Sequence, residues 1–185
     1  MAAAKDFEAL RAFCHETALL EATSALLEWD ERTGLPSKSG GYRADQLTQL
    51  AGMIHTRKTS SELGDLLDRL SCSELAADPT SPPGAAIRKL RKDFDRNARM
   101  PMALVKAISK ATVLGQQAWE RARAADDWKQ FEPHMEEVFK LRREEAALVA
   151  ERVDSGDSNR SEQLRAERAL NEAQAKLVNR RNEYF

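Results

Sequence analysis

The chain has 185 residues, which suits one domain of ordinary size or a domain with an appendage. Lysine and arginine number 29 against 30 aspartates and glutamates, so the formal net charge of −1 excludes a bulk electrostatic attraction to nucleic acid or to an anionic membrane. Hydrophobic residues make up 42% of the chain, which is enough for a core and argues against global disorder.

The composition also indicates the class of protein. Aromatic residues are only 6% of the chain, whereas alanine, leucine, glutamate and arginine are plentiful, and this balance favours helix over sheet. Two cysteines, Cys14 and Cys72, cannot form a disulfide framework and indicate a reducing compartment. The first residues contain no long apolar run, and no stretch approaches the roughly 18 apolar residues of a membrane span. We therefore expect a soluble, cytoplasmic, all-α protein with no membrane partner.

The first half of the chain reads as successive helices. Apolar residues recur at three- and four-residue steps and predict a long amphipathic helix that ends near Trp29. Residues 31–41 carry Gly, Pro and Ser and predict a surface loop. Helical spacing resumes over residues 42–58, and either Ser60 or Ser61 is the expected N-cap of the helix that follows.

Prolines mark the predicted helix boundaries in the second half of the chain. Three of them within residues 78–84 forbid a continuous helix, so a new helix is predicted over residues 85–99. Pro101 is expected to open the next helix. After a corner at residues 125–129, Pro133 is expected to start a further one.

The C-terminal part differs in character. Residues 154–158 break the preceding helix, and residues 161–184 have a helical composition in which apolar residues are sparse among many charges. Such a pattern is typical of a surface, partner-binding or coiled-coil helix. We expect a domain over residues 1–153, built as an irregular bundle of helical hairpins, and a protruding C-terminal helix within an extension over residues 154–185.

One motif surrounds the first predicted loop. The chain reads Leu26-Leu-Glu-Trp-Asp-Glu-Arg-Thr-Gly-Leu-Pro36 and then Tyr42-Arg-Ala-Asp-Gln-Leu47. This motif resembles the N-terminal region of the Taq-type thermostable carboxypeptidases, which are zinc metallopeptidases of mostly helical fold. The residues that match the family pattern are Trp29, Asp30, Thr33, Pro36, Arg43 and Gln46. Residues 62–67, 88–101, 118–119 and 127–133 resemble later parts of that region in the same order, so the resemblance extends from about residue 7 to residue 150.

The family's zinc-binding motif has no counterpart in this sequence. Family members bind zinc through His-Glu-x-x-His on a helix and a further glutamate downstream, whereas the residue four positions after His15 is Leu19. The remaining histidines, His55 and His134, fall on other predicted helices. The resemblance therefore implies that this chain corresponds to the helices that roof the substrate groove and lacks the catalytic part. It also implies that zinc is bound only in full-length members. We predict that this chain alone binds no zinc or other cofactor and releases no C-terminal residues from peptides.

Three origins fit this pattern: a fragment of a peptidase, a truncated gene product, or a free-standing relative. The alternative function is a free-standing helical protein-interaction module without a peptidase role. A reading frame that continued past Phe185 into a His-Glu-x-x-His motif would favour the peptidase.

The motif around Trp29, Asp30 and Arg43 has two interpretations. It can be a substrate-facing element, or a structural clasp in which Trp29 is buried and Asp30 pairs with Arg43 across the loop. We favour the clasp, in which case Trp29→Ala should cost about 3–5 kcal/mol, the range for deleting a buried large aromatic.

The sequence bears on two kinds of partner, nucleic acid and protein. The helix over residues 88–99 concentrates lysine and arginine, but it lacks aromatic stacking partners and the chain is nearly neutral, so nucleic acid is not expected. A region that resembles one layer of a larger enzyme should expose apolar surface, and we expect a homodimer or docking to a catalytic domain. Residues 159–185 are predicted to cover this apolar surface. They would fold back on their own bundle, pair with the same segment of a second copy in a symmetric dimer, or remain a solvated helix.

Overall fold

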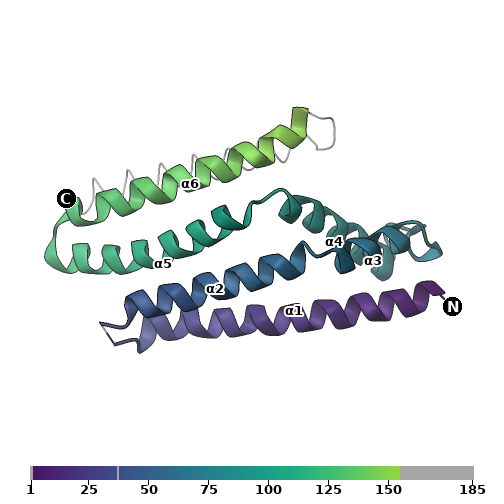
Figure 1. Ribbon diagram of the computed structural model, residues 1–185, viewed down its shortest axis with the longest axis horizontal. Helices are drawn as coiled ribbons and strands as arrows, with labels where there is room; N and C mark the ends of the chain where they lie inside the picture. The colour runs from purple at the N-terminus through teal and green to yellow at the C-terminus, as the bar shows by residue number, and fades with distance from the viewer. Residues whose placement is uncertain (1, 37, 155–185) are drawn as a thin grey trace. The chain divides into compact units, whose positions relative to one another are not determined.

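The computed structural model describes residues 2–36 and 38–154, and these are helical with no strand among them (Figure 1). The prediction of an all-α fold is confirmed. The helices are α1 (Ala2–Thr33), α2 (Gly40–Lys58), α3 (Ser61–Ser71), α4 (Pro82–Ala98), α5 (Met102–Ala125) and α6 (Trp128–Asp154), with a short 3₁₀ turn η1 (Glu74–Ala76) after α3. None of the helices in this described part is long and apolar enough to cross a membrane.

The chain divides into two compact units, residues 1–110 and residues 111–185. The first unit contains α1 to α4 and the start of α5. The second contains the rest of α5 and the described helix α6. The predicted helix over residues 161–184 lies outside the described residues, so the division of the chain at residue 154 stays a prediction.

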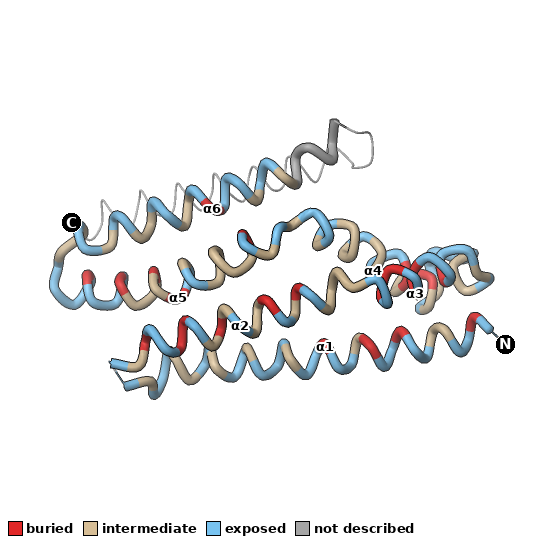
Figure 2. The backbone as a smooth tube through the Cα atoms, viewed as in Figure 1, coloured by how far each residue is buried: buried red, intermediate tan, exposed pale blue. Residues whose placement is uncertain are grey.

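The core of the first unit forms where α1 meets α3 and α4. α2 runs back alongside α1, and the buried positions recur along α2 and α3 (Figure 2). Leucines at three- and four-residue spacing put one face of α3 entirely into the core. The buried cluster consists of Leu10, Phe13, Leu63, Leu67, Leu70 and Ile87.

Two serines decide where helices begin. Ser60 is the N-cap of α3, because its hydroxyl accepts the Leu63 N–H at 3.3 Å. Ser81 caps α4 in the same way by accepting the Gly84 N–H at 3.2 Å. α4 therefore begins at Pro82, three residues before the predicted start, since prolines in the first turn need no N–H partner.

Two other predicted boundaries were wrong. α1 continues four residues past Trp29 to Thr33, and its end is closed by the Asp30 carbonyl, which accepts the N–H groups of Gly34 and Leu35. α5 begins at Met102, with Pro101 just outside the helix and its carbonyl accepting the first backbone N–H.

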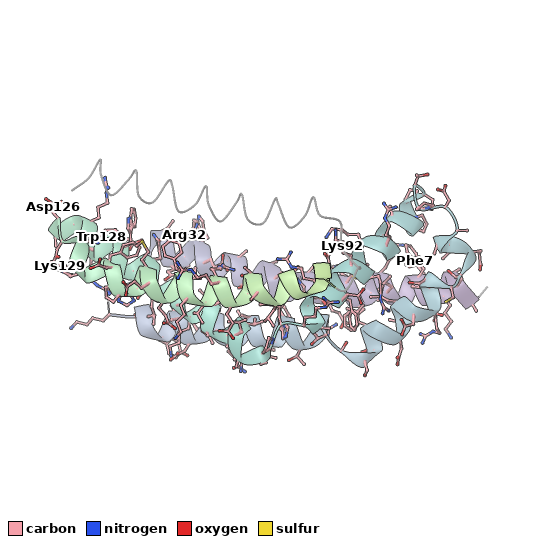
Figure 3. All side chains as sticks on the ribbon, turned by 90° about the horizontal axis from the view of Figure 1, so that it is seen from above. Phe7, Arg32, Lys92, Asp126, Trp128 and Lys129 are labelled. Carbon is pink, nitrogen blue, oxygen red and sulfur yellow. The ribbon has the colours of Figure 1, made fainter. Side chains whose placement is uncertain are left out.

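The corner between α5 and α6 corrects a further prediction. Asp126 adopts a φ of 51°, and the Asp127 carboxylate accepts the Lys129 N–H at 3.1 Å. This cap starts α6 at Trp128, so Pro133 lies inside the helix and does not start it. Figure 3 shows the side chains of Asp126, Trp128 and Lys129 at this corner.

Candidate functional site

Arg43 organises the end of the α1–α2 hairpin. It lies in the first turn of α2, and only 10% of its side chain is exposed. One terminal nitrogen donates to the Leu27 carbonyl at 2.6 Å, and the other donates to Asp30 Oδ2 at 2.7 Å. Its Nε donates to Gln46 Oε1 at 3.0 Å. These contacts satisfy the guanidinium on three sides and place Arg43 across the loop as predicted.

Trp29 is not part of this arrangement. It was expected to be buried, but 64% of it is exposed. The reason is helical geometry: Leu27 and Asp30 are three residues apart and share the face of α1 that meets Arg43, whereas Trp29, two residues after Leu27, points to another side. The clasp therefore consists of Asp30, Arg43 and Gln46 without the tryptophan.

The exposure of Trp29 changes the expected mutational effect. Trp29→Ala should alter the free energy of unfolding by no more than about 0.5 kcal/mol, as is usual for surface substitutions. Chemical denaturation followed by circular dichroism measures this change. A loss of about 3 kcal/mol, as the burial hypothesis required, would contradict the exposed position.

Thr33 and Pro36, two further motif residues, form hydrogen bonds with nearby backbone groups. The Thr33 hydroxyl donates to the Trp29 carbonyl at 2.9 Å, within α1. Pro36 is exposed, and its carbonyl accepts the Ser39 N–H at 2.8 Å just before α2 begins. The structure thus brings Asp30, Arg43 and Gln46 together and leaves Thr33 and Pro36 with local contacts.

A second arginine, Arg57, joins the same two helices and was missed in the sequence. Its Nε donates to the Thr17 hydroxyl at 3.2 Å, and its Nη2 lies 2.9 Å from Glu16. Nη2 also reaches the Phe13 carbonyl at 3.5 Å, and the guanidinium stands 4.5 Å from the centre of the Phe13 ring.

The two arginine sites repeat one geometry. Arg43 and Arg57 are fourteen residues apart on α2, and the carbonyls that they reach, Leu27 and Phe13, are fourteen residues apart on α1. In each case the paired carboxylate follows the carbonyl residue by three positions. Antiparallel helices bring such pairs into register, so the two arginines fix the alignment of α1 against α2.

The described residues offer little for metal or nucleophilic chemistry. Among residues 2–36 and 38–154, no group of three His, Cys, Asp or Glu side chains is close enough to hold a metal ion. His55 is buried and His15 is exposed. Burial, and secondarily the charge of Glu21, raises the pKa of the Cys14 thiol, which disfavours the thiolate that ligation or attack would need.

Two cations of the basic helix α4 are paired with acidic neighbours. Arg91 pairs with Asp68 on α3 and with Asp95 at 3.1 Å, and Lys89 pairs with Asp93. A cation that is paired in this way is less available to a phosphate group. The expectation that nucleic acid is not a partner stays a prediction.

The comparisons with known proteins agree with the hairpin motif. A model of the carboxypeptidase Taq (M32) metallopeptidase family matches residues 9–160. The chain belongs to this family. Thermostable carboxypeptidase 1 of Thermus thermophilus is 34% identical over 143 residues, which are 77% of this chain and 28% of that protein. Carboxypeptidase 1 of Bacillus subtilis is 29% identical over 117 residues, which are 63% of this chain and 23% of that protein.

Solved structures of similar proteins share the fold. The M32 carboxypeptidase from Deinococcus radiodurans R1 superposes with a TM-score of 0.60 at 31% identity, over 80% of this chain and 29% of that one. The BsuCP crystal structure gives a TM-score of 0.66 at 25% identity, over 79% of this chain and 28% of that one. The chain thus spans under a third of each of these four relatives.

Proposed function

We propose that this chain is a non-catalytic helical part of an M32 metallocarboxypeptidase, corresponding to the N-terminal helices that cover the substrate groove. The observation that carries the proposal is the family match over residues 9–160, combined with coverage of only 28% of the Thermus relative. The sequence contains no His-Glu-x-x-His motif, so the residues present do not fit a catalytic zinc. Zinc binding and peptide hydrolysis would belong to the remaining part of such an enzyme.

The second unit supports a role as one layer of a larger assembly. Trp119 is 39% exposed, and Phe131, Val138 and Phe139 are only half-buried in the described residues. The two helices that the structure describes in this unit cannot enclose a core by themselves, because each buries a single stripe against the other. We infer that the catalytic part of an M32 enzyme covers this surface, since that part makes up most of the relatives' length.

A chimera tests the proposal in an intact enzyme. The matched segment of the Thermus thermophilus carboxypeptidase would be replaced by residues 9–154 of this chain, and chelator-sensitive release of C-terminal amino acids would be measured. We expect activity in the chimera and a marked loss after Trp119→Glu. Tyr42→Glu, which changes an exposed aromatic of the first unit, is the matched control and should retain activity.

The chain by itself is the second arm of the test. It should contain no stoichiometric zinc by elemental analysis and should release no C-terminal residues from peptides. Zinc with chelator-sensitive activity in the pure chain would refute the non-catalytic role. A folded but inactive chimera would refute the groove-covering role and favour the free-standing interaction module.

A further inference from the structure

α6 carries a second row of side chains beside the one that meets α5. Val138 lies against α5, because a Cβ added to Gly115 would stand 3.8 Å from the Val138 Cγ2. Phe139 is the next residue, so its side chain is turned by about 100° around the helix axis, and it is only half-buried. The outer row, as we name it, consists of Trp128, Glu132, Met135, Phe139, Arg142 and Ala146. None of these six residues is buried, and α6 is mostly intermediate or exposed along its described length (Figure 2).

The spacing of the outer row indicates that a helix covers it. Its members follow one another at alternating steps of four and three residues, which is the spacing of positions a and d in a coiled coil. Trp128, Met135 and Phe139 are its large apolar members. Arg142 pairs with Glu145 at 2.7 Å, which leaves its apolar stem available for packing. α5 cannot cover both rows of α6, because a surface helix packs one apolar stripe against its neighbour.

The C-terminal segment carries a row with the same spacing. Residues 161–184 lie outside the described residues, but their sequence has a helical composition. The tail row, as we name it, consists of Ala166, Leu170, Ala173, Leu177, Arg180 and Tyr184. Its steps are four, three, four, three and four residues, and this order is the same when it is read backwards. The tail row can therefore be laid against the outer row in antiparallel orientation with each member opposite another.

Size and charge match in that register. The layers are Trp128 with Tyr184, Glu132 with Arg180, Met135 with Leu177, Phe139 with Ala173, Arg142 with Leu170 and Ala146 with Ala166. Glu132 and Arg180 have opposite charges, and Phe139 meets a small residue, as facing positions in a packed seam require. A shift of one heptad in either direction would separate Glu132 from Arg180. The charged pair therefore selects this register.

The register also predicts where the chain turns. Every layer is centred on the same position; Ala146 and Ala166, for example, lie ten residues to either side of Gly156. Gly156 is the middle residue of Asp154-Ser-Gly-Asp-Ser158, the segment that the sequence predicts as a helix break. A short connection of this kind places consecutive helices side by side and antiparallel. This agreement supports the register independently, because the layers are defined by the two rows alone.

We propose that residues 161–184 form a helix that folds back in antiparallel orientation onto the outer row of α6 in the same molecule. α5 and this segment then cover α6 from two sides. Of the three arrangements that the sequence leaves open for residues 159–185, this is the cover within one chain.

The inference does not rest on the proposed function. It shares Phe139 with the surface assigned there to a catalytic region, so such a region has to displace the tail row from α6. The chimera contains residues 9–154 alone and tests the proposed function without the tail row. The two proposals can therefore fail separately.

Cysteine cross-linking tests the register. In a chain with Cys14→Ser and Cys72→Ser, the pair Ala146→Cys and Ala166→Cys should form a disulfide within one molecule on mild oxidation, because the two positions share a layer. Ala147→Cys with Ala166→Cys is the matched control. Ala147 is also exposed but points about 100° away from Ala146, so this pair should oxidise about tenfold more slowly. Size-exclusion chromatography and mass spectrometry without reductant distinguish a link within a monomer from a link between two molecules.

Charge reversal tests the layer that selects the register. Glu132→Arg alone and Arg180→Glu alone each put like charges in one layer. Each should lower the hydrogen-exchange protection of the amides of residues 161–184 by about two- to fivefold, the effect of losing one partly exposed ion pair. Combining the two changes should restore the protection. Glu137→Arg with Arg180→Glu is the matched control and should not restore it, because Glu137 is exposed on α6 outside the outer row.

Four results would overturn the proposal. These are amides of residues 161–184 that exchange without protection in the full chain, equal oxidation rates for the two cysteine pairs, a disulfide between two molecules, and a double charge reversal that does not restore protection. A disulfide between molecules would assign the segment to a second copy. Circular dichroism of each variant shows that the helices remain intact, since every altered residue of α6 is exposed.

Discussion

Arg43→Met should lower the free energy of unfolding of this chain by about 2–3 kcal/mol, the cost of removing a charged donor that is hydrogen-bonded and largely buried. The methionine keeps the apolar stem of the side chain but loses the contacts to Leu27, Asp30 and Gln46. Asp30 is partly exposed and can be rehydrated, which keeps the cost below that of a fully buried pair. Denaturant unfolding, with the slope compared between variants, measures the effect.

Arg57→Met is the control that the repeated geometry supplies. Arg57 reaches α1 in the same register, but 30% of its side chain is exposed and its partner Glu16 is exposed. Arg57→Met should lower the free energy of unfolding by about 1 kcal/mol, because water can replace much of the hydrogen bonding that this partly exposed arginine provides. If Arg57→Met proved as costly as Arg43→Met, burial would not be what makes the loop clasp strong.

The hairpin illustrates what the sequence could predict. The pairing of Asp30 with Arg43 was predicted correctly because the motif links residues on either side of one short loop, so few geometries are available to them. The prediction that Trp29 is buried was wrong, because an aromatic residue in a motif need not be a core residue. The helical positions of Leu27 and Asp30 settle the direction of Trp29, and the extension of α1 to Thr33 makes that geometry apply.

Arg57 was missed for a different reason. Its partners lie 40 residues or more away in the chain, and no local pattern joins them. The only available signal was the equal spacing of Arg43 and Arg57 against Asp30 and Glu16, which becomes informative once α1 and α2 are known to be antiparallel. Long-range contacts of this kind depend on helix register, which periodicity alone does not fix.

Helix starts depended on caps more than on prolines. The prolines of residues 78–84 interrupt the helix as predicted, but Pro82 is itself the first residue of α4, and Pro133, the predicted helix start, lies inside α6. Ser81 and Asp127 are the residues that accept the free N–H groups, and each places the helix start immediately after itself. Ser81 and Asp127, the capping residues upstream of these prolines, are the sequence signals for both boundaries.

Gly84→Ala is expected to lower the free energy of unfolding by about 1–3 kcal/mol, the usual cost of forcing an extra carbon into a packed site. A Cβ at Gly84 would stand 2.1 Å from the Asp78 carbonyl oxygen and 3.0 Å from the Ser81 hydroxyl, and a backbone oxygen cannot move aside as the end of a side chain can. Relief of this clash would open the turn over residues 78–84 and weaken the Ser81 cap that starts α4. Ile87, which α4 carries into the core, would then be less well held.

Gly52→Ala is the matched control, with the opposite expected sign. A Cβ there would meet the Lys106 side chain near its flexible end, at 2.5 Å, and that end can swing away. Because Gly52 lies inside α2, alanine should stabilise the helix by up to about 0.5–1 kcal/mol. Thermal or denaturant unfolding of both variants therefore separates a backbone clash from a change in helix propensity.

The same turn gives Gly84→Ala a second readout. The Thr80 hydroxyl, and after it the Thr80 N–H, donates to the Asp78 carboxylate and lowers the pKa of that group. A carboxyl whose pKa is lowered on folding stabilises the folded chain above its unfolded pKa, and this contribution is lost as the pH falls through the folded pKa. Opening the turn should return the pKa of Asp78 toward its ordinary value, which an NMR titration of the carboxyl carbon would detect. An Asp78 titration that is identical in the native chain and in Gly84→Ala, with unchanged stability, would show that the turn accepts the added methyl group and that the close approach at Gly84 is not required.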